Sequence, residues 1–252
     1  MPSRTRRLGV LGGTFDPIHL GHLAAATAAA SALGLEEVLL VPSRTPPHRR
    51  VDPAASVFHR FAMVALAAAT DPRLVASDLE LDRTGASYTA DTLRALHATG
   101  LAAWQIFFTT GADAFAEIAT WREYPSVLEL AHFVVCARAD IEASSLRARL
   151  PELAGRMVLL APNVWDAGRS AVGRPRQEGD EPWNGRETRI FLLDGQTPDI
   201  SSTAVRARAR AGRPLAGLVP PEVDDYIRRH GLYGAPAGAA DGGRSAAGNL
   251  HE

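Results

Sequence analysis

The stretch Gly12–His22, with the sequence GGTFDPIHLGH, separates an apolar run at Leu8–Leu11 from an Ala- and Leu-rich run at Leu20–Leu33. The first run is typical of a buried strand and the second of a helix, so the stretch predicts a glycine-rich turn between them. At such a turn, backbone N–H groups and the helix N-terminus can bind a phosphate. His19 and His22 are three positions apart at the start of the predicted helix, so both can face the same bound group.

The remainder of the chain alternates further apolar strands with helical patterns. We expect strands at 38–41, 74–76, 105–109, 133–136, 157–160 and 190–193, and helices at 57–69, 89–96, 114–119, 126–131, from 146 onward, from the 200–206 segment to near 212, and at 222–230. This alternation predicts an α/β fold, a Rossmann-like doubly wound parallel sheet with helices on both faces.

The length and composition predict one domain. Residues 1–233 are expected to form a single α/β unit. Residues 162–188 break every periodicity and are rich in Gly, Pro and charge, so we expect a mobile insertion there rather than a second domain. Residues 234–252 are rich in Gly and Ala, which predicts a disordered tail.

The charge is balanced, with 27 basic and 28 acidic residues, and gives no reason to expect a nucleic acid partner. Cys136 is the single cysteine and lies in an apolar run, so we expect a buried hydrophobic residue rather than a nucleophile. Without disulfides, the chain suits the reducing cytoplasm. No segment has the length and hydrophobicity of a signal core or membrane span, so we expect no membrane association. A homo-oligomer remains an open possibility.

Each of five polar segments follows the carboxyl end of an expected strand. They are residues 12–22, 42–50, 110–113, 138 and 200–206. In open α/β sheets, ligands bind outside the carboxyl ends of the strands, at the point where the strand order reverses. We therefore expect these five segments to line one cleft.

Two of these segments resemble motifs of a known family. Residues 12–22 resemble the nucleotidyltransferase signature that contains H-x-G-H, and the GGTFDP lead-in is similar to that of bacterial nicotinate-nucleotide adenylyltransferases. Residues 200–206, ISSTAVR, resemble the I-S-S-T-x-x-R motif of the same enzymes. The resemblance covers residues 7–233 apart from the expected insertion. It implies the nucleotidyltransferase type of fold and the transfer of AMP from ATP to nicotinate mononucleotide, which gives deamido-NAD and pyrophosphate in NAD biosynthesis.

The implied reaction needs two anionic reactants in line and positive charge where pyrophosphate leaves, and no protein nucleophile. The implied catalytic residues are His19, His22 and Arg206. The histidines would donate to the transferring phosphate, and Arg206 would reach the triphosphate. Mg²⁺ would be held mainly through the ATP phosphates, because no dedicated carboxylate cage is visible in the sequence. A zinc-binding pair or simple helix capping is the alternative for the two histidines.

The resemblance also implies the ATP-binding residues. Hydroxyls and N–H groups at the start of the predicted 200–212 helix suit the triphosphate, and an acidic side chain after a strand suits ribose hydroxyls. Capping of its own helix is the alternative for Asp113. The expected ATP-binding residues are Gly12, Gly13, Thr14, Phe15, Gly21, Gly111, Asp113, Ile200, Ser201, Ser202 and Thr203.

The acceptor site is expected from a third segment. Residues 86–93, ASYTADTL, resemble the S-Y-T-x-x-T-L stretch that lines the pyridine site of the nicotinate enzymes. N–H groups at this helix start can point at a carboxylate, and Trp121 can stack on the ring. Each of these residues has an alternative role. Thr89 would cap its helix, Trp121 would occupy a core position, Asp16 would set the turn, and His48 would belong to a solvated basic loop. The expected nicotinate mononucleotide-binding residues are Asp16, His48, Tyr88, Thr89, Trp121 and Arg138.

Other functions fit the sequence less well. No G-x-x-x-x-G-K-[ST] is present for a P-loop kinase, and the first turn is not the G-x-G-x-x-G of a dehydrogenase. Pantetheine-phosphate adenylyltransferase is the nearest alternative among the adenylyltransferases. A non-catalytic nucleotide-binding regulatory module is the alternative from another class.

Overall fold

The computed structural model describes residues 6–46, 52–137, 143–160, 187–194 and 197–235. Its centre is a seven-stranded sheet in the order β3-β2-β1-β4-β5-β7-β6, in which every neighbouring pair is parallel. This confirms the predicted parallel α/β sheet. The strands are β1 (Leu8–Gly13), β2 (Glu37–Pro42), β3 (Leu74–Ala76), β4 (Ile106–Gly111), β5 (His132–Cys136), β6 (Met157–Leu160) and β7 (Ile190–Leu193).

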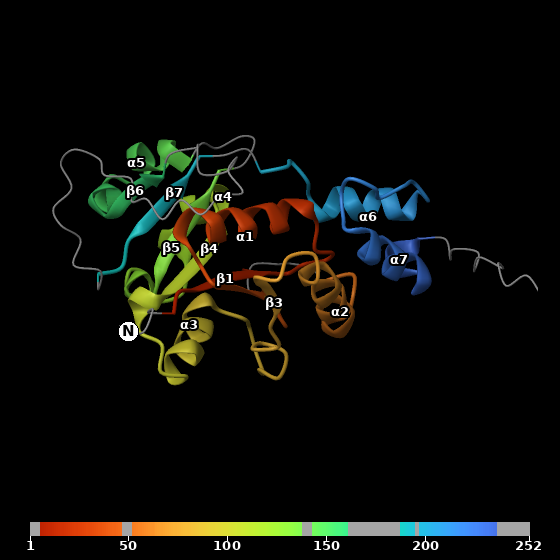
Figure 1. Cartoon of the computed structure of the whole chain (residues 1–252), viewed down its shortest axis with the longest axis horizontal. Coiled ribbons are helices and arrows are strands. Elements are labelled where there is room, and N and C mark those ends of the chain that lie inside the picture. The colour runs from red at the N-terminus through yellow and green to blue at the C-terminus, as the bar shows by residue number, and fades with distance from the viewer. Residues whose placement is uncertain (1–5, 47–51, 138–142, 161–186, 195–196, 236–252) are drawn as a thin grey trace, which may run out of the picture.

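Helices cover both faces of the sheet, as predicted (Figure 1). Successive strand residues point to opposite faces, so Phe107 joins one core cluster and Phe108 the other. The first cluster contains residues of α1, α2, α6 and α7, and the second contains residues of α3, α4 and α5. The helices are α1 (Leu20–Leu33), α2 (Val57–Ala68), α3 (Thr89–Ala98), α4 (Ala112–Ala116), α5 (Leu146–Arg149), α6 (Ser202–Arg210) and α7 (Pro221–Arg229).

The strand order reverses between β1 and β4. From β1 the chain continues outward to β2 and β3, whereas β4, β5, β6 and β7 lie on the other side. Leu8 pairs with Ile106, so β1 and β4 run in register, and the turns that follow them open at the same edge. This is the position at which open α/β sheets bind ligands. In Figure 1, α6 and α7 lie together at one end of the molecule, beside α2.

Two predicted helices are shorter than expected. The 114–119 prediction corresponds to α4 and a 3₁₀ turn at Ile118–Thr120, and the 126–131 prediction to a 3₁₀ turn at Ser126–Glu129. Trp121 has an extended backbone, and Pro125 disfavours a helical conformation at the residue before it. The connection between β4 and β5 is therefore divided into single turns.

The predicted boundaries of the insertion and the tail also need correction. Thr188, inside the predicted insertion, is buried, and its hydroxyl donates to the carbonyl of Leu128 at 2.9 Å. Gly234 ends a 3₁₀ turn, η7 (Leu232–Gly234), and Ala235 is buried in the core. Local composition did not reveal these anchoring contacts. Residues 161–186 and 236–252 lie outside the described part. No helix within the described ranges is long and apolar enough to span a membrane.

His132 is a buried ionisable group at the start of β5. Its side chain is inaccessible to solvent, and its Nδ1 accepts the backbone N–H of Arg189 at 2.9 Å. The imidazole stacks on Phe107, with 4.6 Å between ring centroids. Burial is the main cause that lowers the pKa of His132 to about 4, so the ring is neutral at pH 7.

We expect the wild-type protein to lose about 2 kcal/mol of unfolding free energy relative to His132→Asn between pH 7 and pH 5. The unfolded chain takes up a proton at His132 below pH 6.5, while the folded chain does so only near pH 4. Stability therefore falls as the pH falls through this window. Asparagine is a matched control because its oxygen can replace Nδ1 as the acceptor. Urea unfolding of both proteins measures the difference, and a difference that is independent of pH would contradict neutral burial.

Candidate active site

The glycine turn after β1 is fixed by its neighbours. The carbonyl of Gly13 accepts the backbone N–H of Ser43 at 2.8 Å and the Ser43 hydroxyl at 3.2 Å, which joins this turn to the one after β2. A Cβ at Gly13 would lie 3.0 Å from the ring of Phe15. Phe15 itself is buried and has a φ of 49°. The sequence GGTF thus places the backbone of residues 12–15 at the reversal point of the sheet.

The two histidines of the turn lie against each other. Their rings stack with 3.6 Å between centroids and an angle of 21°. His22 Nδ1 accepts the backbone N–H of His19 at 3.3 Å. A neutral His22 therefore carries its proton on Nε2, which makes Nε2 a donor. His19 is only 2% exposed, whereas His22 is partly exposed, so His22 is the more accessible of the pair.

Gly21 allows the start of α1 to approach the segment before α6. A Cβ at this position would lie 3.0 Å from the carbonyl oxygen of Pro198 and 3.1 Å from His19 Nδ1. A larger residue would therefore displace either this chain segment or the His19 ring. The first motif thus approaches the segment that directly precedes the second motif, nearly the whole chain away in sequence.

The start of α6 is attached directly to the glycine turn. Ser202 donates its hydroxyl to the carbonyl of Pro17 at 2.9 Å, and Arg206 Nη1 donates to the carbonyl of Asp16 at 2.7 Å. Arg206 Nη2 also donates to the hydroxyl of Thr203 at 3.2 Å. The Ser201 side chain accepts the N–H of Ala204 and caps the helix. A helix N-terminus, an arginine and a histidine thus meet beside the turn, which suits a polyphosphate.

The third motif lies beside the turn after β2. Ser87 donates its N–H to the carbonyl of Thr45 at 2.9 Å, and its hydroxyl accepts the N–H of Arg44 at 3.0 Å. Tyr88 is the N-cap residue of α3, and its side chain makes no capping hydrogen bond. The first N–H groups of α3 therefore donate no hydrogen bond to the side chain of their N-cap residue.

Trp121 is partly buried at the other side of this region. Its ring meets Phe108 edge-on at 6.2 Å and Phe133 at 6.2 Å. The neighbouring Arg122 guanidinium lies 4.6 Å from the ring centre of Tyr88, so the segment after α4 and the start of α3 are adjacent. The tryptophan thus packs against the core while retaining an exposed portion.

Three more of the predicted residues lie within the described part of the chain, and two lie outside it. Gly111 ends β4 and is the N-cap residue of α4, and Asp113 is exposed in the first turn of that helix. Both lie at the reversal point, next to the glycine turn. Ile200 is buried just before α6. His48 and Arg138 lie outside the described residues.

Comparison with known proteins identifies the family. The sequence profile of the cytidylyltransferase-like family matches residues 10–208. A protein of Moorella thermoacetica named "Probable nicotinate-nucleotide adenylyltransferase" is 36% identical over 231 residues, covering 92% of this chain and 93% of that protein. One of the same name from Desulfatibacillum aliphaticivorans is 38% identical, covering 90% and 99%. The chain belongs to the nicotinate-nucleotide adenylyltransferases.

A solved structure of low sequence identity also shares the fold. The structure of the Plasmodium falciparum nicotinic acid mononucleotide adenylyltransferase complexed with NaAD matches with a TM-score of 0.63 at 17% identity. It covers 91% of this chain and 98% of the Plasmodium chain. This likeness confirms the predicted Rossmann-like nucleotidyltransferase fold.

Asp16, which is predicted among the acceptor-binding residues, is buried. Its carboxylate is 1% exposed and accepts the N–H groups of Ala54 at 2.8 Å and Ala55 at 3.1 Å. It also accepts the hydroxyl of Tyr233 at 3.0 Å, and Arg206 Nη1 lies 3.7 Å away. Protein groups thus surround this carboxylate, and its contact with the acceptor stays a prediction. The turn-setting alternative agrees with the geometry.

Arg60 also organises the site, although it was not among the predicted residues. This side chain is 1% exposed and donates to the carbonyls of Thr14 at 2.6 Å, Arg44 at 3.2 Å and Ala55 at 3.3 Å. It therefore joins the turn after β1 to the turn after β2. The sequence did indicate that Arg60 is buried, because Arg60 lies on the same face of α2 as Met63, Val64 and Ala67. A charged side chain on an apolar helix face requires internal partners.

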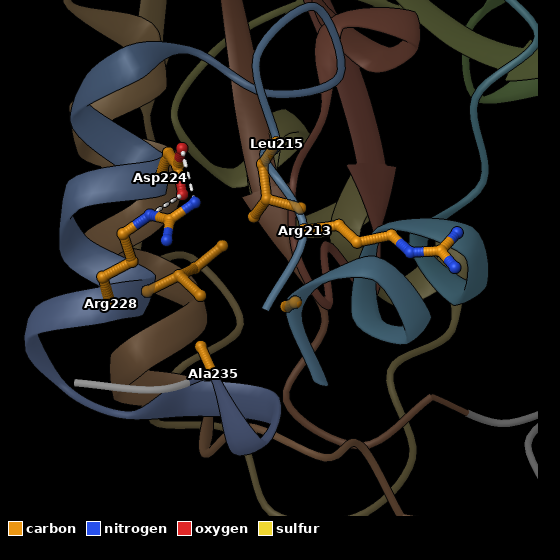
Figure 2. A pocket seen from close by; sticks show the side chains of 7 residues that line it. Arg213, Leu215, Asp224, Arg228 and Ala235 are labelled. Carbon is orange, nitrogen blue, oxygen red and sulfur yellow. Dashed lines mark hydrogen bonds and ion pairs between the residues drawn. The ribbon is translucent and has the colours of Figure 1, made fainter. Parts of the chain in front are cut away.

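A separate hollow lies between α6 and α7, and Figure 2 shows its side chains. Asp224 and Arg228 pair with each other at 2.8 Å, while Arg213 points away from them. The hollow has no room for a water-sized molecule. The hollow is lined by Ala209, Arg213, Leu215, Asp224, Ile227, Arg228 and Ala235.

Proposed function

We propose that this chain transfers AMP from ATP to nicotinate mononucleotide, with deamido-NAD and pyrophosphate as the products. The observation that carries the proposal is the attachment of α6 to the glycine turn through Ser202 and Arg206, beside His22. This arrangement provides hydrogen-bond donors and a cation. Transfer of a nucleotidyl group requires such positioning and charge neutralisation rather than a protein nucleophile.

In the proposed reaction, a phosphate oxygen of nicotinate mononucleotide attacks the α-phosphorus of ATP. The bond between this phosphorus and the bridging oxygen breaks, and pyrophosphate leaves with that electron pair. His22 donates from Nε2 to the α-phosphate, where charge develops, and Arg206 contacts the triphosphate. His19 supports the His22 ring by stacking. The N–H groups of Ser201, Ser202 and Thr203 and the hydroxyls of Ser201 and Thr203 bind the leaving phosphates, while the Ser202 hydroxyl holds α6 against Pro17.

The two nucleosides are proposed to bind on either side of the sheet reversal. Asp113 would bind the adenosine ribose beside Gly111, and residues 12–15 would lie against the ATP phosphates. The first N–H groups of α3, at Tyr88 and Thr89, would bind the nicotinate carboxylate, with Trp121 against the pyridine ring. By family resemblance, His48 and Arg138 would bind the phosphate of nicotinate mononucleotide.

A magnesium ion fits this site only as part of the nucleotide complex. Among the described residues, no group of three or more His, Cys, Asp or Glu side chains could hold a metal ion. The ion would be held through phosphate oxygens and water, as Mg²⁺ commonly is, and would supply neutralising charge. The partners we propose are ATP and nicotinate mononucleotide, while homo-oligomerisation and a cytoplasmic location stay predictions.

Excess chelator is expected to lower turnover by ~10-fold or more, and added Mg²⁺ should restore it. Without the ion, negative charge on two substrates would accumulate where only a few protein cations are present. Initial rates measured with and without chelator, each followed by re-addition of Mg²⁺, test this dependence. Undiminished activity in chelator would contradict the metal's role.

An acceptor panel tests the proposed function. Pyrophosphate release from ATP is measured with nicotinate mononucleotide, nicotinamide mononucleotide and phosphopantetheine in turn. We expect the highest kcat/KM with nicotinate mononucleotide. Preference for phosphopantetheine would favour the alternative adenylyltransferase, and ATP binding without release in any reaction would favour a regulatory module.

A further inference from the structure

The C-terminal turn η7 contains a residue in an unusual conformation. Tyr233 has φ 61° and ψ 16°, between Gly231 at φ 58° and Gly234 at φ 75°. A left-handed backbone is costly for a residue with a Cβ and persists only where its surroundings hold it. Tyr233 is 8% exposed, and the following Ala235 is buried and donates its N–H to Leu232 at 3.0 Å. The turn thus directs the tyrosine side chain into the protein.

The tyrosine hydroxyl reaches the glycine turn of the active site. It donates to Asp16 Oδ1 at 3.0 Å, across 217 positions of sequence. Burial is the main cause that raises the pKa of Tyr233 above its usual range, and the charge of Asp16 raises it further. The hydroxyl is therefore protonated at neutral pH and acts as the donor to the carboxylate.

Asp16 connects this hydroxyl to Arg206. Arg206 Nη1 donates to the Asp16 carbonyl at 2.7 Å and lies 3.7 Å from Oδ2 of the same residue. The N–H groups of Ala54 and Ala55 hold the other sides of the carboxylate. The Arg206 side chain is 21% exposed, so its guanidinium contacts Asp16 on the buried side and can still be reached by a ligand from solvent. Its orientation thus depends on the position of Asp16.

We propose that Tyr233 is a positioning residue for ATP: its hydroxyl fixes Asp16, and Asp16 directs the Arg206 guanidinium toward the triphosphate. The proposal rests on the adenylyl transfer proposed above, because that function gives Arg206 its phosphate contact. It assigns the C-terminal turn to the active site, although η7 follows the last recognised motif by many residues. A purely structural tyrosine would stabilise the fold without coupling to Arg206.

A double-mutant cycle between Tyr233→Phe and Arg206→Ala tests this coupling. The first readout is the Kd of a non-hydrolysable ATP analogue, and the second is KM for ATP in turnover. Tyr233→Phe alone is expected to raise both by about 3- to 10-fold, with KM for the acceptor nearly unchanged. In the Arg206→Ala background, the same change should have almost no further effect. Tyr226→Phe is the matched control, since its hydroxyl contacts His59 Nδ1 at 2.9 Å and not the site.

The outcomes separate the positioning role from the fold and from the reaction. Equal effects of Tyr233→Phe in both backgrounds, or no effect in either, would overturn the proposal. If Tyr233→Phe fails to fold by circular dichroism, Asp16→Asn replaces it and should show the same lack of additivity with Arg206→Ala. If the wild-type protein binds the ATP analogue but does not turn over, the proposed adenylyl transfer is contradicted. The positioning role is still tested in that case, because the cycle of Kd values measures the coupling between Tyr233 and Arg206 without turnover.

Discussion

Replacement of His22 by alanine is expected to lower kcat by a factor of about 10²–10³, the typical effect of removing a transition-state hydrogen-bond donor. The stacked arrangement with His19 and the bond from the His19 N–H to Nδ1 fix the ring and leave the proton on Nε2. This donor strengthens its interaction as charge develops on the α-phosphate. The loss should therefore appear in kcat more than in KM for ATP.

Two further substitutions at His22 make the test specific. His22→Asn retains an acceptor near Nδ1 but has no donor at Nε2, whereas His22→Gln can place an amide N–H near Nε2. We expect the glutamine variant to retain more kcat than the asparagine variant. His59→Ala is the control, since His59 contacts Tyr226 away from the turn. Wild-type kcat in a folded His22→Ala protein would show that the assigned role is wrong.

A preference for the acid over the amide is the second large effect that we expect. The ratio of kcat/KM between nicotinate and nicotinamide mononucleotide should reach at least ~10²-fold, from about 3 kcal/mol of differential binding. Tyr88 does not cap α3, so the first N–H groups of this helix have no side-chain acceptor there. A carboxylate can accept charge-assisted hydrogen bonds from them, while the NH₂ group of a carboxamide cannot accept any.

Steady-state kinetics with both acceptors measure this preference. Trp121→Ala serves as the companion variant, because loss of the ring should weaken both acceptors and leave their ratio nearly unchanged. Comparable kcat/KM values for acid and amide in the wild-type protein would overturn the specificity and leave adenylyl transfer intact. A change of the ratio in Trp121→Ala would show that this ring itself discriminates between them.

The sequence predicted those parts of the fold that depend on local patterns. Continuous apolar runs bounded by glycine or polar turns predicted the strands Leu74–Ala76, Met157–Leu160 and Ile190–Leu193 with their observed limits. The Ala-rich run at Leu20–Leu33 was predicted as a helix with equal accuracy. Parallel strands place their carboxyl ends at one edge, so the grouping of the motifs followed from the alternation of elements.

Long-range contacts were beyond the reach of local patterns. Asp16 and Tyr233 are 217 positions apart, and the positive φ of Tyr233 has no signature apart from its neighbouring glycines. The partners of Arg60 lie in the turn after β1 and in the connection between β2 and α2, although its place on an apolar helix face was visible in the sequence. The short turns around Pro125 follow from backbone restrictions that helical periodicity does not register.

Transfer of the α-phosphorus of ATP is the most direct measurement of the proposed reaction. Unlabelled nicotinate mononucleotide is incubated with Mg²⁺, the protein and ATP that carries a label at the α-phosphorus. We expect the label in deamido-NAD, together with an equimolar amount of unlabelled pyrophosphate. Label that remains in ATP, or that appears as AMP whether or not the acceptor is present, would contradict adenylyl transfer to nicotinate mononucleotide.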